Sequence, residues 1–279
     1  MSGINYNPNL EEILAKPYKR VLIGADLHCG HRVGLTPPRF QSAACGEKYR
    51  KIQIECWDLY TKIIDGLKPI DRYLINGDAI DGAGTRSGGT ELIVPEIKFQ
   101  QEAAIECIKY AEAKKVRMAR GTDYHTSPGY QDAEDDIAKE LGGKIGDHEW
   151  FDVYSPNGEH KKTYDMKHHL GNTSMPYGKG TKIEKDQVLN LIWKEYEDQP
   201  RGDIFIRSHV HWEWFCGNRI WTGFVTPALQ AMGSKFGGRK CNQHVDFGLL
   251  HVDHYNDGSV LWNFHTVAVP SQQATAEKL

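Results

Sequence analysis

The sequence predicts an α/β protein whose strands are mostly parallel. Short apolar stretches alternate with longer amphipathic ones along most of the chain, and two hairpin-like stretches follow near its end. Alternating strands and helices favour a parallel sheet, since parallel neighbours need a long connection, usually a helix. The late hairpins add antiparallel strands at an edge. No Pro/Gly/Ser-rich or charged linker divides the 279 residues, so we expect one domain over residues 1–279.

The first half of the sequence supplies three strands and three helices. Strands are expected at 19–28, 71–78 and 115–121, and helices at 47–66, 95–113 and 131–143. Each expected strand is a short apolar run that ends abruptly in polar residues. The first helix shows the helical spacing well, with Ile52, Cys56 and Leu59 on one face.

The second half continues with a larger share of strand. Strands are expected at 161–169 and 203–209, a helix at 183–198, and hairpins at 217–226 and 246–264. In the helix, the spacing of Leu189, Ile192 and Tyr196 predicts that these side chains face the core. In the last hairpin, the run Asn256-Asp257-Gly258 is a strong turn signal.

The composition narrows the class of protein. Lysine and arginine total 34 against 37 acids, a formal net charge of -3. This balance does not suggest a broad basic surface for duplex nucleic acid or anionic membrane, although it leaves room for a local basic patch. Six cysteines without a CxxC pair fit a reducing compartment. No segment approaches the ~18 apolar residues of a membrane span. We therefore expect a cytoplasmic protein without a membrane partner, with residues 1–18 as an extension and 267–279 as a disordered tail.

Polar, metal-binding side chains follow the expected strands. In chain order they are Asp26 and His28, Asp78 and Asp81, Thr122 to His125, His168 and His169, and His209 and His211. Each motif alone is ambiguous, because a histidine on a strand is more often a satisfied core residue than a ligand. Together they should converge, since functional side chains in such sheets gather beyond the carboxyl ends of the strands. Converging acids and imidazoles indicate divalent cations, and Asp78 could bridge two of them.

The order of these motifs resembles the calcineurin-like metallophosphoesterase superfamily. Its pattern is D-x-H, G-D-x-x-D, G-N-H-[DE], H and G-H-x-H, and this chain has "DLH", "GDAID", "GTDYH", "KHHLG" and "SHVH" between residues 26 and 211. The stretches "DLHCGHRVGLTPP" and "FVTPALQAMGSKFG" also resemble phage- or prophage-encoded members. The resemblance implies a four-layer α-β-β-α sandwich of two mixed sheets flanked by helices, with a two-metal site at one end.

The resemblance also implies roles for individual residues. Asp26, His28 and His211 would hold the first metal, and Asp78 would bridge to the second. His209 would hold the second metal together with His168 or His169, of which His168 is preferred. Manganese is the expected ion, with iron, zinc and nickel as alternatives.

One motif departs from the family pattern. Thr122 stands where the family has an asparagine ligand, and Asp123 stands where it has a histidine. Asp123 could replace the missing ligand, or Thr122 could act through its hydroxyl group or a water molecule. His125 is then the expected acid that protonates the leaving group. Ser208 replaces the usual glycine before H-x-H, a milder change.

The resulting functional hypothesis is a two-metal phosphoesterase. We expect it to hydrolyse a phosphodiester, in a nucleotide or nucleic acid, by attack of a metal-bridging hydroxide. Arg32, Arg86, Lys235 and Arg239 are candidate contacts to the substrate phosphate. The alternatives are a phosphomonoesterase and a catalytically weakened, metal-binding phage structural or interaction protein. A metal-dependent amidohydrolase is disfavoured, since those sites open with H-x-H, and the phage resemblance would place the protein in an infected host cell.

Overall fold

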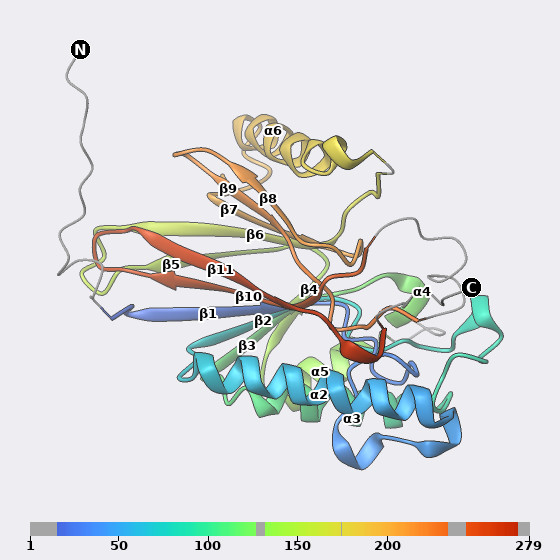
Figure 1. Ribbon diagram of the computed structural model, residues 1–279. Helices are drawn as coiled ribbons and strands as arrows, with labels where there is room; N and C mark the ends of the chain where they lie inside the picture. The colour runs from blue at the N-terminus through green and yellow to red at the C-terminus, as the bar shows by residue number, and fades with distance from the viewer. Residues whose placement is uncertain (1–15, 127–131, 174, 234–243, 273–279) are drawn as a thin grey trace, which may run out of the picture.

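The computed structural model describes residues 16–126, 132–173, 175–233 and 244–272. These residues form two β-sheets that face each other, with helices on the outer surface of each sheet (Figure 1). This arrangement confirms the predicted α/β class and the four-layer α-β-β-α sandwich of two mixed sheets. No helix in the described part of the chain is long and apolar enough to cross a membrane.

The first sheet has six strands in the order β11-β10-β1-β2-β3-β4. Their bounds are β1 Lys19–Gly24, β2 Arg72–Asn76, β3 Lys115–Ala119, β4 Lys144–Gly146, β10 Phe247–His254 and β11 Val260–Val267. Strands β1 to β4 are parallel to one another, and the β10–β11 hairpin pairs antiparallel with β1. The predicted parallel sheet with an antiparallel edge is therefore present.

The second sheet has five strands in the order β5-β6-β7-β9-β8. Their bounds are β5 Glu149–Tyr154, β6 Lys161–His169, β7 Ile204–Ser208, β8 Trp214–Gly217 and β9 Thr222–Val225. Strands β6, β7 and β9 are parallel, while β5 and β8 pair antiparallel at the two edges. The sequence did not predict β4 and β5, because β4 has only three residues and β5 has no strong apolar alternation.

Helices cover the outer faces of both sheets. The α-helices are α2 Glu47–Leu67, α3 Ile97–Tyr110, α4 Asp123–Thr126, α5 Ala133–Glu140 and α6 Thr181–Glu195. Short 3-10 helices span Pro38–Phe40, Ala43–Cys45, Thr85–Ser87, Pro176–Gly178 and Pro270–Gln272. Helices α2, α3 and α5 pack on the first sheet, α6 lies over the second, and α4 is a single turn after β3 (Figure 1).

The first sheet is buried on both faces. Along β1, Val21 and Ile23 join the core between the sheets, while Leu22 joins the core under the helices. A strand buried on both sides needs apolar residues at successive positions, which explains the continuous apolar runs in the sequence. The polar residues that follow these strands therefore mark the end of the sandwich.

The prediction for the face of α6 was wrong. Leu189, Ile192 and Tyr196 are 39%, 47% and 70% exposed, while Ile183 and Asn190 are buried against the second sheet. On its inner side the helix combines the apolar burial of Ile183 with polar contacts, among them the hydrogen bond from Gly202 N–H to Asn190 Oδ1 at 2.9 Å. Apolar spacing shows that the side chains share a face, and it does not show which neighbour that face meets.

Residues 267–272, expected to belong to a disordered tail, are ordered. Val269 is buried in the core beneath the helices. Ser271 donates two hydrogen bonds to the carboxylate of Glu55 in α2, from its N–H at 2.8 Å and its Oγ at 2.7 Å. Apolar burial and these bonds therefore order the chain as far as residue 272, and residues 273–279 lie outside the described part.

Candidate metal centre

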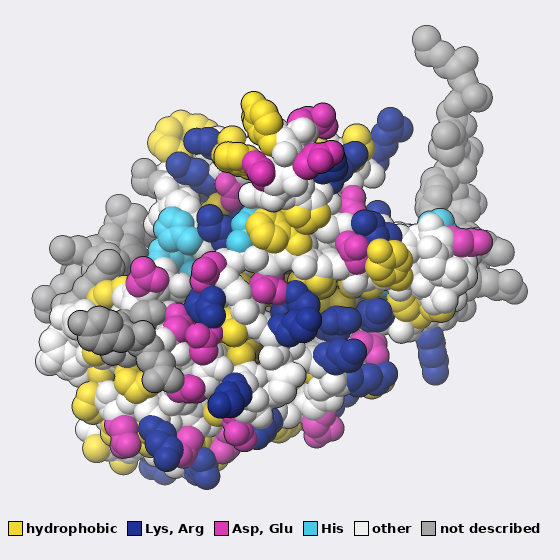
Figure 2. Space-filling model, turned by 180° about the vertical axis from the view of Figure 1, so that it is seen from behind, with side chains coloured by type: hydrophobic (Ala, Val, Ile, Leu, Met, Phe, Trp, Pro, Cys, Tyr) yellow, Lys and Arg dark blue, Asp and Glu magenta, His cyan; other side chains and the backbone are white. Residues whose placement is uncertain are grey.

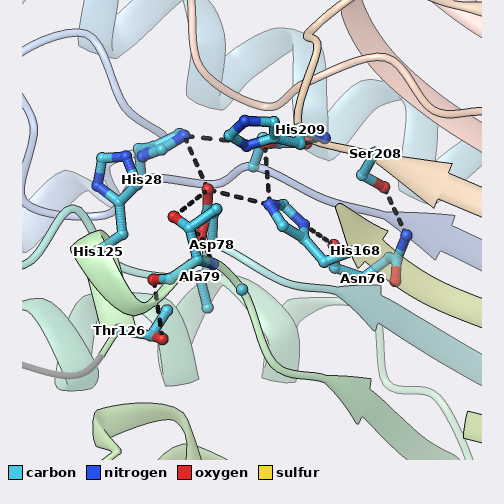
Figure 3. Close-up of polar contacts among 12 residues, drawn as sticks. His28, Asn76, Asp78, Ala79, His125, Thr126, His168, Ser208 and His209 are labelled. Carbon is cyan, nitrogen blue, oxygen red and sulfur yellow. Dashed lines mark hydrogen bonds and ion pairs between the residues drawn. The ribbon is translucent and has the colours of Figure 1, made fainter. Parts of the chain in front are cut away.

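The predicted ligands come together at one end of the sandwich, between the two sheets (Figures 1 and 3). The first sheet contributes the turns after β1, β2 and β3, and the second contributes the end of β6 and the turn after β7. All five motifs lie at carboxyl ends of parallel strands, as the sequence predicted. Their ligand atoms form three overlapping groups.

The first group consists of Asp26, His28 and His211. Nε2 of His211 lies 3.2 Å from Oδ1 of Asp26 and 3.3 Å from Nε2 of His28. Nε2 of His28 lies 3.9 Å from the same carboxylate oxygen. Asp26 and His28 are buried and His211 is partly buried, so the group is screened from bulk water on most sides.

The second group consists of Asp78, His168 and His209. Nε2 of His168 lies 3.1 Å from Oδ2 of Asp78. The same carboxylate oxygen lies 4.0 Å from Nε2 of His28 in the first group. Figure 3 shows His28, His168 and His209 arranged around Asp78. This carboxylate thus lies between the two groups, where a bridging ligand would be needed.

Two buried polar atoms indicate that the site fits metal ions. Oδ1 of Asp26 and Nε2 of His168 are fully buried and make no hydrogen bond of good geometry among the described residues. Their near neighbours are other ligand atoms, Nε2 of His211 at 3.2 Å and Oδ2 of Asp78 at 3.1 Å. A buried polar atom without a partner costs free energy, and a bound cation would remove that cost. The donor set of imidazole nitrogens and carboxylate oxygens suits borderline divalent ions such as Mn²⁺, Fe²⁺ and Zn²⁺.

The backbone at this site is strained. Seven described residues other than glycine have positive φ, and five of them are the ligand candidates Asp26, His28, Asp78, His209 and His211. The left-handed region is unfavourable for residues with a Cβ, and such conformations persist where the surrounding structure enforces them. The concentration of strain on these five residues supports a functional site.

Two glycines allow the motif turns to pack closely. A Cβ on Gly121 would overlap the Asp78 carboxylate, and a Cβ on Gly77 would lie 2.5 Å from Nδ1 of His168. Gly77 also has φ +81°, which a glycine adopts at little cost. The motif glycines are therefore required by the geometry of the neighbouring ligands.

Hydrogen bonds behind the ligands orient their rings. Nδ1 of His28 lies 3.1 Å from Oδ1 of Asp81, and Nδ1 of His168 lies 2.5 Å from the carbonyl oxygen of Asn76. With the Nδ1 proton donated to these oxygens, each Nε2 would offer its lone pair to a metal ion once it has lost its own proton. Partners of this kind fix the tautomer of metal-binding histidines.

Glu134 of α5 was not foreseen as part of the site. Its side chain is fully buried and accepts backbone hydrogen bonds from Ala79 at 2.8 Å and from Gly121 at 2.7 Å. These donors lie next to Asp78 and Thr122, so one carboxyl group joins the turns after β2 and β3. Burial raises the pKa of Glu134 to about 8. Its place on the apolar stripe of α5, with Ile137 and Ala138, was the available signal.

The altered third motif contributes two residues to the site. The Thr122 N–H donates to Oδ1 of Asp78 at 2.7 Å, and the Thr122 hydroxyl donates to the same oxygen at 3.1 Å. Nδ1 of His125 lies 2.9 Å from the carbonyl oxygen of Asp81, and His125 forms the third ligand group with His28 and Asp78. Asp123 is exposed in the first turn of α4 and belongs to none of the three groups.

The two adjacent histidines of β6 point in opposite directions. His168 is buried beside Asp78, whereas His169 is exposed, and its ring centroid lies 4.8 Å from that of His209. Of the two, only His168 has a ligand atom grouped with those of Asp78 and His209 among the described residues. The structure brings His168 to that position.

Opposite charges shift the pKa values of the site residues. Although burial alone would raise it, the pKa of Asp78 lies well below its usual range because His168 and His28 are close. Burial lowers the pKa of His168, but the Asp78 and Asp26 carboxylates outweigh this and raise it to about 10. Burial lowers the pKa of His209 to about 4.

The predicted substrate contacts are only partly described. Arg32 is partly buried, its guanidinium lies 4.6 Å from the ring centroid of Tyr49, and its buried Nε has no hydrogen-bond partner among the described residues. The backbone of Arg86 lies in a 3-10 helix, and its side chain lies outside the description. Lys235 and Arg239 also lie outside the described residues.

Comparisons with known proteins give similarity at the level of the fold. No protein-family model matches the chain, and no curated protein sequence matches it. Vps29 of Entamoeba histolytica complexed with Zn²⁺ is 14% identical, with a TM-score of 0.43 over 88% of this chain and 98% of that one. An archaeal phosphodiesterase is 10% identical, with a TM-score of 0.40 over 88% and 99% of the two chains. A predicted phosphoesterase of Streptococcus pneumoniae is 11% identical, with a TM-score of 0.35 over 89% and 98%.

Proposed function

We propose that the protein is a phosphoesterase of the calcineurin-like type that depends on two divalent metal ions. The observation that carries this proposal is the position of Asp78 between two groups of buried ligand atoms, with one carboxylate oxygen 3.1 Å from Nε2 of His168 and 4.0 Å from Nε2 of His28. Sites with two metals commonly hold their ions ~3.5–4 Å apart, bridged by shared ligands.

Each metal would have its own set of ligands. Asp26, His28 and His211 would hold the first ion, His168 and His209 would hold the second, and Asp78 would bridge them. When bound, such ions supply Lewis acidity and a water nucleophile at neutral pH. The residues that hold them would keep both ions fixed, because their Nδ1 and backbone contacts leave the rings little freedom.

We assign His125 as the acid for the leaving group. The carbonyl of Asp81 accepts the proton of its Nδ1, which leaves Nε2 to hold or release a second proton. Burial lowers the pKa of His125, and the proximity of His28 lowers it further. An anionic phosphate ester nearby would favour the protonated ring, so His125 would gain its second proton when substrate binds.

A phosphodiester, as in a nucleotide or nucleic acid, is the proposed substrate class. No lysine or arginine of the described residues forms an ion pair with the carboxylates of the three ligand groups. A diester carries one negative charge fewer than a dianionic monoester, so it needs less positive charge from the protein. Arg32 is the described candidate for an additional phosphate contact.

Hydrolysis of model substrates tests the proposal. The purified protein should hydrolyse bis(p-nitrophenyl) phosphate faster than p-nitrophenyl phosphate when Mn²⁺ is added, and chelation should abolish the activity. Asp78→Asn and His209→Ala should each lose most of it, while Asp147→Asn and His244→Ala, at exposed positions, should retain it. Metal-independent activity would contradict the proposal, and bound metal without turnover of any phosphate ester would favour a metal-binding interaction protein.

A further inference from the structure

The outer face of α6 carries an apolar stripe that the fold does not use. Val188, Leu189, Ile192, Trp193 and Tyr196 are all exposed, Val188 by 53% and Trp193 by 44%. Their spacing of three and four residues places them side by side along the helix. In Figure 2 hydrophobic side chains gather on the surface at the top of the molecule, where Figure 1 shows α6.

The inner face of α6 explains why this stripe points outward. Asp186 pairs with Arg207 of β7 at 2.7 Å. The Asn190 amide donates to the carbonyl of Pro200 at 3.0 Å and accepts from Gly202. These directional contacts fix the rotation of the helix about its axis, so the apolar stripe stays in solvent. Contiguous apolar surface of this kind marks an interaction site in soluble proteins.

We propose that this face is a dimer interface at which α6 packs antiparallel against α6 of a second copy of the chain. A twofold axis at the level of Asn190, on the opposite, outer face of the helix, pairs residues whose numbers sum to 380, so Val188 of one copy meets Ile192 of the other. An interface of this type uses the same patch on both subunits, and one helix face supplies both halves.

The charges on α6 match this register. The axis places Lys185 opposite Glu195 of the second copy, twice by symmetry. Both residues are exposed, and neither has an ion pair within the described part of the chain. On a helical projection Lys185 lies beside Ile192, and Glu195 lies beside Val188 on the other side. The charge pairs would therefore flank the apolar contact. The same axis places no like charges opposite each other along the helix.

Charge complementarity favours a second copy over another partner. A helix with apolar residues in the middle, a lysine before them and a glutamate after them is complementary to its own antiparallel image. The interface lies on the outer layer, and its formation does not depend on metal binding or on the proposed hydrolysis.

Sedimentation velocity over a wide concentration range tests the interface. We expect a reversible monomer–dimer equilibrium, and we expect Ile192→Glu to make the protein monomeric. Leu261→Glu is the matched control, because Leu261 is 56% exposed on β11 and lies outside the stripe. It should leave the dimer dissociation constant unchanged. A wild-type protein that stays monomeric at every concentration, or a dimer that survives Ile192→Glu, would overturn the proposal.

A charge exchange tests the register itself. Lys185→Glu and Glu195→Lys alone should each raise the dimer dissociation constant by about tenfold or more, because each places like charges opposite each other. The double variant should restore the wild-type value. If the singles have no effect, or the double variant is weaker than either single, the antiparallel register is wrong.

Two further measurements show whether a variant has lost dimerisation alone or has also lost its fold or its activity. The circular dichroism spectrum and the unfolding midpoint at low protein concentration should match those of the wild type, since all substituted positions are exposed. Hydrolysis per subunit should also be unchanged in the monomeric variants. An inactive protein that still dimerises would refute the proposed function and leave the interface standing.

Discussion

Oδ1 of Asp26 lies 3.2 Å from Nε2 of His211, although Asp26 follows a strand of the first sheet and His211 follows a strand of the second. The Asp26 carboxylate also accepts the backbone N–H of His209 at 3.2 Å. One side chain therefore joins the two sheets at the end of the sandwich. Metal ions held there would fix the sheets relative to each other as well as support chemistry.

The first prediction separates the adjacent histidines of β6. His168→Ala should reduce the bound metal from two ions per chain to one and lower diester hydrolysis by about 100-fold, since a ligand substitution typically costs at least this much. His169→Ala removes an exposed ring and should keep both ions. Elemental analysis after gel filtration measures the bound metal, and steady-state kinetics measure the hydrolysis rate. Equal losses of metal and rate in the two variants would contradict the assignment of His168 as the ligand.

The second prediction concerns the close approach of Gly121 to Asp78. Gly121→Ala forces a methyl group into the carboxylate, so it should lower the free energy of unfolding by about 1–3 kcal/mol and weaken metal binding. Gly66→Ala in α2 is the matched control, because a Cβ there meets nothing within 4 Å. It should leave stability unchanged or raise it by up to about 1 kcal/mol. Urea unfolding of both variants checks this, and an equally stable Gly121→Ala variant would refute it.

The third prediction assigns Glu134 a positioning role. Glu134→Ala leaves the buried N–H groups of Ala79 and Gly121 without an acceptor, which should cost about 2–5 kcal/mol of stability in total. It should also weaken Mn²⁺ binding, because both turns carry residues of the site. Glu140→Ala, on the same helix but exposed, should change stability by less than about 0.5 kcal/mol. A Glu134→Ala variant with full metal affinity, measured by isothermal titration, would show that the turns hold their shape without it.

The fourth prediction is that His254 makes the stability of the fold depend on pH. Its Nε2 lies 2.8 Å from the hydroxyl oxygen of Tyr164, in the buried part of the protein. Burial lowers its pKa to about 4. The unfolded state, with a histidine pKa of about 6.5, then binds more protons than the folded state between these values. The free energy of unfolding is therefore highest above pH 6.5. As the pH falls towards 4, His254 lowers it by up to about 3 kcal/mol.

His254→Gln should reduce this loss relative to the wild type. His244→Gln, at an exposed histidine, should not change it. Unfolding free energies at several pH values between 4 and 7 provide the comparison. If the unfolding free energy of His254→Gln falls with pH as steeply as that of the wild type, other groups cause the pH dependence.

The sequence predicted the strands that matter for the site because they are buried on both faces and end in polar residues. Asp26 and Asp78 could be placed together from the sequence, since parallel strands of one sheet bring their carboxyl ends to one edge. His211 follows a strand of the other sheet, and only the family resemblance placed it with them. The choice of His168 over His169 was also available, because strand alternation puts His168 on the face of Met166 and Tyr164.

Other features could not be inferred in this way. The orientation of α6 depends on the pairing of Asp186 with Arg207, which follows from the folded arrangement and not from apolar spacing. Glu134 is one of three acids in the first turn of α5, and its place on the apolar stripe of that helix indicates burial but does not show which backbone groups it binds. Long-range polar contacts of this kind leave little trace in a single sequence.

Anomalous diffraction from a crystal grown with Mn²⁺ tests the central claim most directly. We predict two peaks about 3.5–4 Å apart, one beside Asp26, His28 and His211 and one beside His168 and His209, with Asp78 between them. The absence of ions from this site at saturating Mn²⁺, or a single ion bound away from Asp78, would contradict the account.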